Sequence, residues 1–207
     1  MDKSDSAVVR PSEALGRDQR RFGSDFSTFA TGYPVLSAGG LARMVAQQTG
    51  YECVGIRLLS QDDYPYFSHY GFPAEFIHKE NTLRPEACAA SAPAVCLCGL
   101  VIQGRCGTDC PNLTPDGIFC CDDLHGFDPE AMRGLSLYRG ECPKQGFRSV
   151  VLIPLRREGA TIGLLQLADR RPGLAHQANP DFYRSLGDNI GDTLHPLTAG
   201  EIAVTRA

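Results

Sequence analysis

The sequence predicts an α+β domain in which helices pack against one antiparallel sheet. Two apolar runs in the second half of the chain, FRSVVLIPLRR and TIGLLQLAD, are separated only by a short turn around Glu158 and Gly159. Two such runs joined this closely are typical of a hairpin at the centre of a sheet. Apolar residues with helical spacing lie before the first strand and near the C-terminus. The order helix, strands, irregular segment, hairpin and helix therefore favours an α+β fold.

The first part of the predicted domain contains two helices and two strands. A helix is expected over 34–49, because its apolar residues have helical spacing and Gly50 follows them. Apolar and polar residues alternate over 51–60, which predicts a strand, and a turn then leads to a second short strand over 66–70. A helix of one or two turns is expected to open at Pro73, whose fixed φ suits the first turn of a helix.

The segment 81–142 is the irregular part of the sequence. Proline, glycine, aspartate and cysteine interrupt the apolar periodicity of helices and strands through most of this segment. The exceptions are a short helix expected over 95–103 and a small strand expected over 117–121. An irregular stretch of about sixty residues inside a compact domain is usually functional. The regular elements that follow are the two hairpin strands over 147–157 and 161–169 and an amphipathic helix over 179–194.

The chain of 207 residues is long enough for one domain with its own core and short for two. Residues 1–33 are polar, rich in arginine and without apolar periodicity, and are expected to form a leader or linker. The domain is expected to span 34–196, with a cysteine-rich insertion over 88–142. Residues 197–207 are expected to form a tail.

Composition and charge argue against several classes of protein. The formal net charge of −4 gives no basic surface, so nucleic acid is not an expected partner. The N-terminal segment lacks the apolar core of a signal peptide, and no apolar run approaches the roughly 18 residues of a membrane helix. We therefore expect a soluble, cytoplasmic protein.

Nine cysteines are the most unusual feature of the composition. A cytoplasmic chain of this size does not need disulfides for stability, and an odd number leaves at least one thiol unpaired. The remaining interpretations are metal or cluster ligation, redox chemistry, or burial as small apolar side chains. Burial is expected for Cys53, which lies in the first predicted strand, whereas Cys88 is uninformative.

Four segments of the sequence resemble the GAF domain, a small-molecule sensor module of bacterial and archaeal signalling proteins. They are GYECVGIRLL, GFPAEFIHKENTL, CLCGLVIQG and GFRSVVLIPLRREGATIGLLQLADRRPG. The pairing of Cys-x-Cys-Gly, which begins at Cys96, with the later Cys142 is similar to GAF domains of sensor histidine kinases. The resemblance implies a central antiparallel sheet with helices on one face and a ligand pocket on the other.

The resemblance also implies a route for a signal. In GAF proteins the first and last helices commonly form the dimer interface, so a homodimer through the terminal helices is expected. The sequence contains no kinase segment after the last predicted helix. We therefore expect a histidine kinase or a regulator as the partner, and neither a nucleic acid nor a membrane.

Three thiols are expected at the pocket. In the resembled fold the short helix that carries Cys96 and Cys98 borders the pocket, and Cys142 borders it from the opposite side. Such a set suits a soft metal or an iron–sulfur cluster, because thiolates bind these ions better than oxygen ligands do. An iron–sulfur cluster is the expected cofactor, ahead of haem and zinc. The sequence lacks the Cys-x2-Cys pairs that are usual in structural zinc sites.

Four more cysteines could complete the ligand set. Cys106 and Cys110 lie in a glycine-flanked loop that could fold over the pocket. Cys120 and Cys121 end a predicted strand that would run along the pocket floor. Neighbouring side chains of a strand face opposite ways, so only one of this adjacent pair should enter the site.

Other polar residues are weaker candidates for a metal site. His125 is the one histidine that we expect as a possible further ligand, because it closely follows the cysteine pair. Asp122 and Asp123 suggest hard-metal binding, but an aspartate pair at the end of a strand more often serves a turn.

The favoured function is a sensor rather than an enzyme. The cavity would hold a cysteine-ligated centre, and its redox state, or a small ligand such as oxygen or nitric oxide, would change the packing of the pocket loops. One alternative is a thiol-based oxidoreductase, similar to stand-alone GAF proteins that resemble methionine sulfoxide reductases; it needs a low-pKa thiol and a resolving partner. Another is a pocket for an organic or anionic small molecule, with the thiols as spectators.

Overall fold

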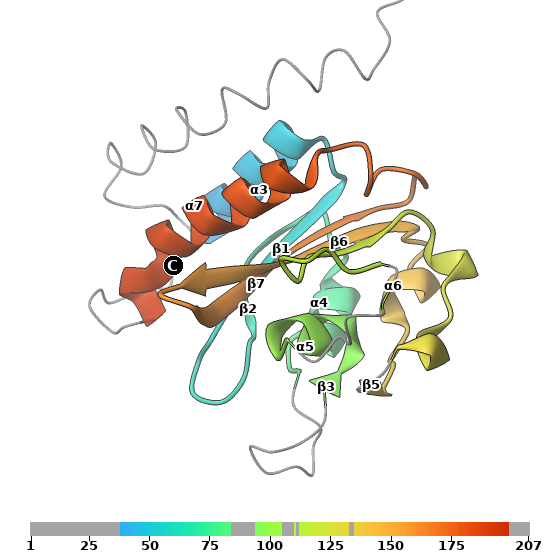
Figure 1. Cartoon of the computed structure of the whole chain (residues 1–207), viewed down its shortest axis with the longest axis horizontal. Coiled ribbons are helices and arrows are strands. Elements are labelled where there is room, and N and C mark those ends of the chain that lie inside the picture. The colour runs from blue at the N-terminus through green and yellow to red at the C-terminus, as the bar shows by residue number, and fades with distance from the viewer. Residues whose placement is uncertain (1–37, 84–93, 105–109, 111, 133–134, 199–207) are drawn as a thin grey trace, which may run out of the picture.

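A central antiparallel sheet organises the computed structural model (Figure 1), which describes residues 38–83, 94–104, 110, 112–132 and 135–198. The strand order is β2-β1-β7-β6-β4, and every neighbouring pair is antiparallel. The strands are β1 (Cys53–Leu58), β2 (Tyr66–Tyr70), β4 (Phe119–Cys121), β6 (Ser149–Arg157) and β7 (Ala160–Asp169). The α+β class predicted from the sequence is confirmed.

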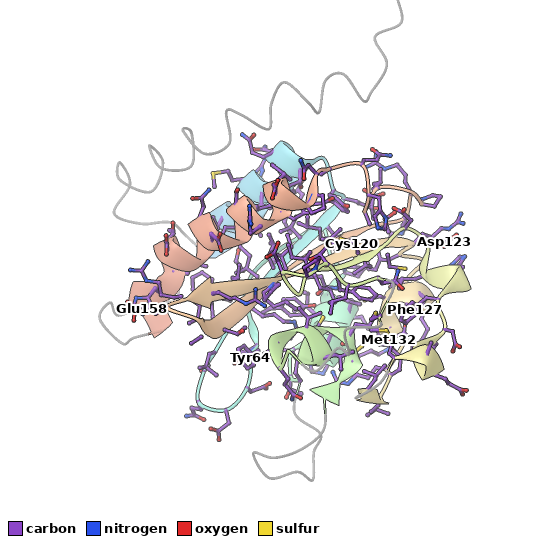
Figure 2. The ribbon with its side chains drawn as sticks, in the orientation of Figure 1. Tyr64, Cys120, Asp123, Phe127, Met132 and Glu158 are labelled. Atoms are coloured by element: carbon purple, nitrogen blue, oxygen red, sulfur yellow. The ribbon has the colours of Figure 1, made fainter. Side chains whose placement is uncertain are left out.

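The hairpin of β6 and β7 lies at the centre of this sheet, as the two apolar runs predict. β7 occupies the middle position, and its pairing with β6 continues to Arg157 opposite Ala160. Glu158 (labelled in Figure 2) and Gly159 form the turn at the tip, and both have a positive φ. A two-residue turn with positive φ at both positions matches the twist of the strands and sets the register of the hairpin.

Two long helices, α3 (Ala38–Thr49) and α7 (Pro180–Thr198), cover one face of the sheet (Figure 1). The first residues of the helix expected over 34–49 lie outside the described residues, and α7 continues beyond its predicted end at residue 194. None of the helices in the described part of the chain is both long enough and apolar enough to cross a membrane.

Two glycines bring α7 close to β6. A Cβ atom at Gly187 would lie 2.7 Å from Cγ2 of Ile153, and a Cβ atom at Gly191 would lie 2.7 Å from the carbonyl oxygen of Arg156. Any larger residue at either position would push the helix away from the strand. The absence of a side chain at these two positions therefore lets α7 rest directly on β6.

The opposite face carries shorter elements, which the sequence predicted only in part. The expected helices are present as α4 (Ala74–Glu80), with Pro73 as its N-cap, and α5 (Cys96–Ile102). The segment expected to be irregular also contains a small parallel sheet, two 3-10 helices and a short α-helix among its described residues. These are β3 (Ala94–Val95), β5 (Leu135–Leu137), η1 (Leu124–Gly126), η2 (Pro129–Ala131) and α6 (Glu141–Lys144). The segment is thus more regular than predicted, because pairing between distant residues, and not local propensity, defines β3 and β5.

The sheet has an apolar core on each face because its strands alternate. Val151 of β6 packs with α3 and α7, whereas Val150 packs with α4 and α5 on the other side. The adjacent residues of β4 divide in the same way, with Cys120 on the side of the long helices (Figure 2) and Cys121 on the opposite side. The sheet therefore separates the two long helices from the short elements.

The buried carboxylate of Asp169 holds the end of β7 to the start of β1. Its oxygens accept hydrogen bonds from the Glu52 amide and from the amide and guanidinium of Arg171, at 2.6–3.0 Å. Burial by itself would raise the pKa of Asp169, but these donors outweigh burial and hold the pKa below its usual value. The carboxylate is therefore charged at neutral pH.

Replacing Asp169 with Ala is expected to lower the free energy of unfolding by about 2–4 kcal/mol at neutral pH, because two amides and a guanidinium lose a charged acceptor. Since the pKa is depressed in the folded state, this contribution is present above the unfolded pKa of roughly 4 and is lost as the pH falls through the folded pKa. Urea unfolding at neutral pH and at about pH 3 measures both effects. Asp181→Ala is the matched control, because that side chain is 70% exposed and the Asp169 side chain 1%. Equal losses in the two variants would contradict this role.

Candidate functional site

A small cavity, which we call the thiol cavity, lies on the face of the sheet that carries the short elements. It is lined by Cys96, Cys98 and Cys142, by the polar residues Tyr66, Glu80, Tyr138 and Gln166, and by Leu97, Leu124, Val150 and Leu152. Its volume of about 10 Å³ is close to the minimum that one buried water molecule requires. The cavity therefore fits an atom-sized occupant unless the elements around it separate.

Helix α5 supplies two of the three thiols. The side chains of Cys96 and Cys98 are buried, and Cys96 stands at the junction of β3 and α5 with a φ of 61°. A residue other than glycine is uncommon in this left-handed region and costs free energy there, so the surrounding contacts must hold it in place. The turn at this junction allows both thiols to line the same cavity.

Cys142, the last residue of the segment expected to be irregular, reaches the cavity from the short helix α6. Nε2 of Gln166 donates to the Cys142 sulfur over 3.6 Å, and Oε1 of Gln166 accepts a hydrogen bond from the Tyr66 hydroxyl at 2.7 Å. Tyr66 therefore sets the orientation of the Gln166 amide, so that the NH2 group of this amide faces the thiol.

All three cavity thiols have pKa values above the usual value of cysteine. Burial is the main cause: it raises the pKa of Cys98 to about 12 and raises the pKa values of Cys96 and Cys142 as well. The negative charge of Glu80 adds to the effect, whereas Arg57 opposes it at Cys98 and Cys142. The thiols are therefore protonated at neutral pH, and protonated thiols are weak nucleophiles.

A buried arginine, which the sequence patterns did not predict, supports one wall of the cavity. Arg57 is fully buried in β1, and its guanidinium carbon lies 3.7 Å from the centre of the Tyr66 ring. Its Nη atoms donate to the backbone carbonyls of Tyr64, Glu80 and Asn81 at 2.5–3.2 Å. A signal for this role was present, because Arg57 is the one charged residue in the buried strand CVGIRL, where a charge must be paired.

Glu80 is the acidic residue among the described residues that line the thiol cavity. It ends α4 and is only 3% exposed. Its Oε2 atom lies 3.5 Å from Nη1 of Arg139, whereas its Oε1 atom has no hydrogen-bond partner. Burial raises the pKa of Glu80, and Arg139 and Arg57 oppose this increase. A residue of the cavity lining thus has a buried, unpaired carboxylate oxygen, which the sequence patterns also did not predict.

Known structures share the overall fold of this chain. No family model and no curated protein matches the sequence. The GAF domain of a phosphoenolpyruvate-protein phosphotransferase from Coxiella burnetii superimposes with a TM-score of 0.61 at 11% identity, over 93% of this chain and 100% of that one. The chain has a GAF-like fold.

Two further structures are similar to this GAF-like chain. The GAF domain of the Acinetobacter phosphoenolpyruvate-protein phosphotransferase has a TM-score of 0.56 at 14% identity, over 94% of this chain and 100% of that one. The free methionine-R-sulfoxide reductase of Neisseria meningitidis, in complex with its substrate, has a TM-score of 0.55 at 12% identity, over 98% and 100%. Identities this low show a common fold and do not by themselves show a common function.

The cavity lining includes none of the other candidate cysteines that the structure describes, which are Cys110, Cys120 and Cys121. The Cys110 thiol donates to Sδ of Met132 over 3.2 Å, and Met132 lies among the short elements (Figure 2). Cys121 packs in the apolar core on the cavity side, and Cys120 faces the long helices, so the adjacent pair divides between the two faces as predicted. Cys106 lies outside the described residues. Three predicted ligands therefore share the cavity, and Cys120 lies on the wrong face of the sheet to join them.

The remaining predicted residues lie outside the cavity lining. His125 is exposed in η1, and its amide donates to Oδ1 of Asp123, so this aspartate serves a turn as expected. Asp122 pairs with His176 at 2.7 Å, and Cys53 is buried in the core as predicted. In the described segments, no group of three or more His, Cys, Asp or Glu side chains is already arranged to hold a metal ion.

Replacing Arg57 with Leu is expected to lower the free energy of unfolding by about 3–5 kcal/mol, because buried carbonyl oxygens lose their donors. Arg184→Leu is the control: its side chain is 50% exposed on α7, and the change should cost no more than about 0.5 kcal/mol. Chemical denaturation of both variants measures the difference. Similar stabilities would show that the guanidinium does not hold this half of the molecule together.

Replacing Gln166 with Leu is expected to slow the alkylation of Cys142 several-fold, because the thiolate loses a hydrogen-bond donor and its pKa rises further. In the reduced wild type the rate should still be increasing above about pH 9, since the pKa of Cys142 is already raised. Iodoacetamide labelling with peptide mass spectrometry measures the rate, with the partly buried Cys110 as an internal reference. Tyr66→Phe, which frees the Gln166 amide, should act in the same direction. An unchanged ratio of Cys142 to Cys110 labelling in both variants would contradict the proposed orientation.

Proposed function

We propose that this chain is a signal-sensing module that binds its ligand in the thiol cavity. The observation that carries the proposal is the convergence of Cys96, Cys98 and Cys142 on one small cavity, next to the buried carboxylate of Glu80. The GAF-like fold supports a sensory role, since the solved structures that it resembles include GAF domains. A reducing compartment such as the cytoplasm would keep these thiols available for a ligand.

The proposed occupant is a thiolate-ligated metal centre held by the three cavity cysteines. Thiolates are the ligands that soft metals prefer, and such a centre would supply a redox change or an exchangeable coordination position as the signal. An iron–sulfur cluster is the centre expected from the sequence, with haem and zinc as alternatives. A cluster or a haem would require the elements around the cavity to separate, whereas a single ion would not. Cys106, outside the described residues, stays a candidate for a further ligand.

The cavity is connected to the long helices through β6. Val150 and Leu152 line the cavity, and Val151 between them packs in the core beneath α3 and α7. A shift of β6 would therefore reach α7, which rests on this strand at Gly187. We propose that the terminal helices mediate a homodimer and pass the change to a histidine kinase or regulator partner.

A thiol-based redox enzyme is the second candidate function. The similarity of the fold to the free methionine-R-sulfoxide reductase of Neisseria meningitidis favours it. Such an enzyme needs a nucleophilic thiol of low pKa, however, and burial raises the pKa values of Cys96, Cys98 and Cys142. The geometry therefore supports a ligand-binding role better, and a metal-free pocket for an organic molecule is the remaining alternative.

Protein purified without oxygen is expected to contain iron with acid-labile sulfide, or another soft metal, and to show thiolate-to-metal absorption. Cys142→Ala should lose most of the metal, because one of the three cavity thiols is removed. Cys53→Ala should retain it, since that buried thiol lies outside the cavity lining. Metal analysis and absorption spectra of the three proteins provide the measurement. Equal metal content in both variants would refute the ligand assignment, and a colourless, metal-free wild type would direct attention to thiol chemistry or an organic ligand.

A further inference from the structure

Glu80 lines the thiol cavity, and the protein itself leaves one of its carboxylate oxygens unpaired. Oε1 of Glu80 has no hydrogen-bond partner, although the residue is only 3% exposed. Arg139 approaches the other oxygen, Oε2, and remains 3.5 Å from it. An unpaired buried carboxylate oxygen costs folding free energy, so a group that occupies the cavity is expected to use it.

The Nη atoms of Arg57 and the amide of Gln166 are engaged elsewhere. The Nη atoms of Arg57 donate to three backbone carbonyls, including that of Glu80 itself, and so hold the end of α4 rather than the carboxylate. The Gln166 amide is shared between the Tyr66 hydroxyl and the Cys142 sulfur. The Oε1 atom of Glu80 therefore remains available to an occupant.

We infer that Glu80 is the fourth donor of a mononuclear metal site, which it completes together with Cys96, Cys98 and Cys142. This inference rests on the proposed function and narrows it. Three sulfur donors and one carboxylate oxygen suit a borderline divalent ion such as Zn²⁺, Fe²⁺ or Co²⁺, and four protein donors are what a tetrahedral site requires. The cavity volume of about 10 Å³ matches a single ion better than a cluster.

The charges around the cavity fit this donor set. Three thiolates and one carboxylate would be balanced by a divalent ion together with the guanidinium groups of Arg57 and Arg139. Arg57 is fully buried against the Tyr66 ring of the cavity wall, and Arg139 pairs with Glu80. Buried charges need local compensation, so two arginines at this place suit a site that becomes anionic when its thiols bind an ion.

The site would assemble as the ion binds. The described side chains are not already spaced as metal ligands, and ligands commonly come together and lose their protons only when the metal enters. The donors belong to three short helices: Glu80 to α4, Cys96 and Cys98 to α5, and Cys142 to α6. The ion would therefore tie together three elements on the same face of the sheet.

The test is Co²⁺ binding to the reduced full chain without oxygen, followed by absorption spectroscopy and metal analysis. The wild type is expected to bind a single ion, with thiolate-to-cobalt charge-transfer bands and the d–d bands of a tetrahedral site. Glu80→Gln should keep the charge-transfer bands and bind about ten to a hundredfold more weakly. Glu75→Gln is the matched control, because Glu75 lies on the same helix, is 70% exposed and pairs with Lys79. It should bind as the wild type does.

A second variant, Glu80→Cys, separates a ligand role from a structural role. A thiolate in place of the carboxylate should restore tight binding and strengthen the charge-transfer bands, which a purely structural role does not predict. Equal affinity and equal spectra for the wild type and Glu80→Gln would overturn the role of Glu80 and leave a thiol-ligated centre in place. If the wild type bound no Co²⁺, the mononuclear site would be wrong, and the iron and sulfide content of protein purified without oxygen would decide separately on the proposed cluster.

Discussion

The burial of one guanidinium group holds together the half of the molecule that contains the thiol cavity. Arg57 lies in β1, a strand buried along its whole length, and its donors bind carbonyls at the end of α4 and before β2. A buried cation without such partners would cost several kcal/mol, so the segments that provide the carbonyls cannot move away from it independently. The position of Glu80 at the cavity follows from this constraint, because its own carbonyl is one of the acceptors.

The same cation is linked to the chemistry of the cavity through a short series of contacts. Arg57 lies over Tyr66, the Tyr66 hydroxyl binds Gln166, and Gln166 donates to Cys142. Each group sets the orientation of the next, so a change at the thiol would be transmitted to β7 and β1. Burial keeps the thiols protonated and weakly nucleophilic, yet protonated thiols still bind ions that displace their protons. The environment that disfavours enzymatic turnover is therefore compatible with the proposed sensor.

Most of the sheet and both long helices could be predicted from the sequence, because their apolar periodicities are local patterns. The central hairpin has its expected place, and Glu158 and Gly159 form its turn. Site prediction was more mixed. The resemblance to GAF domains predicted that Cys96, Cys98 and Cys142 lie at one pocket, and these three residues do line the thiol cavity. Strand alternation correctly divided the cysteines of β4 between two faces, but no local pattern shows which face a cavity occupies.

The sequence by itself determined the strands of the central sheet and the two long helices, and the resemblance to GAF domains indicated Cys96, Cys98 and Cys142 as cavity residues. Only the tertiary structure decided how β3 pairs with β5, that Cys142 lies on a helix, and that Arg57 binds the carbonyl of Glu80, a residue of the cavity lining. Arg57 and the carbonyl of Glu80 are 23 residues apart in the chain, and Tyr66 and Gln166 are 100 apart. Periodicity reports the face of a single element, whereas the partner of a buried polar group is chosen by packing between elements, which no local pattern records.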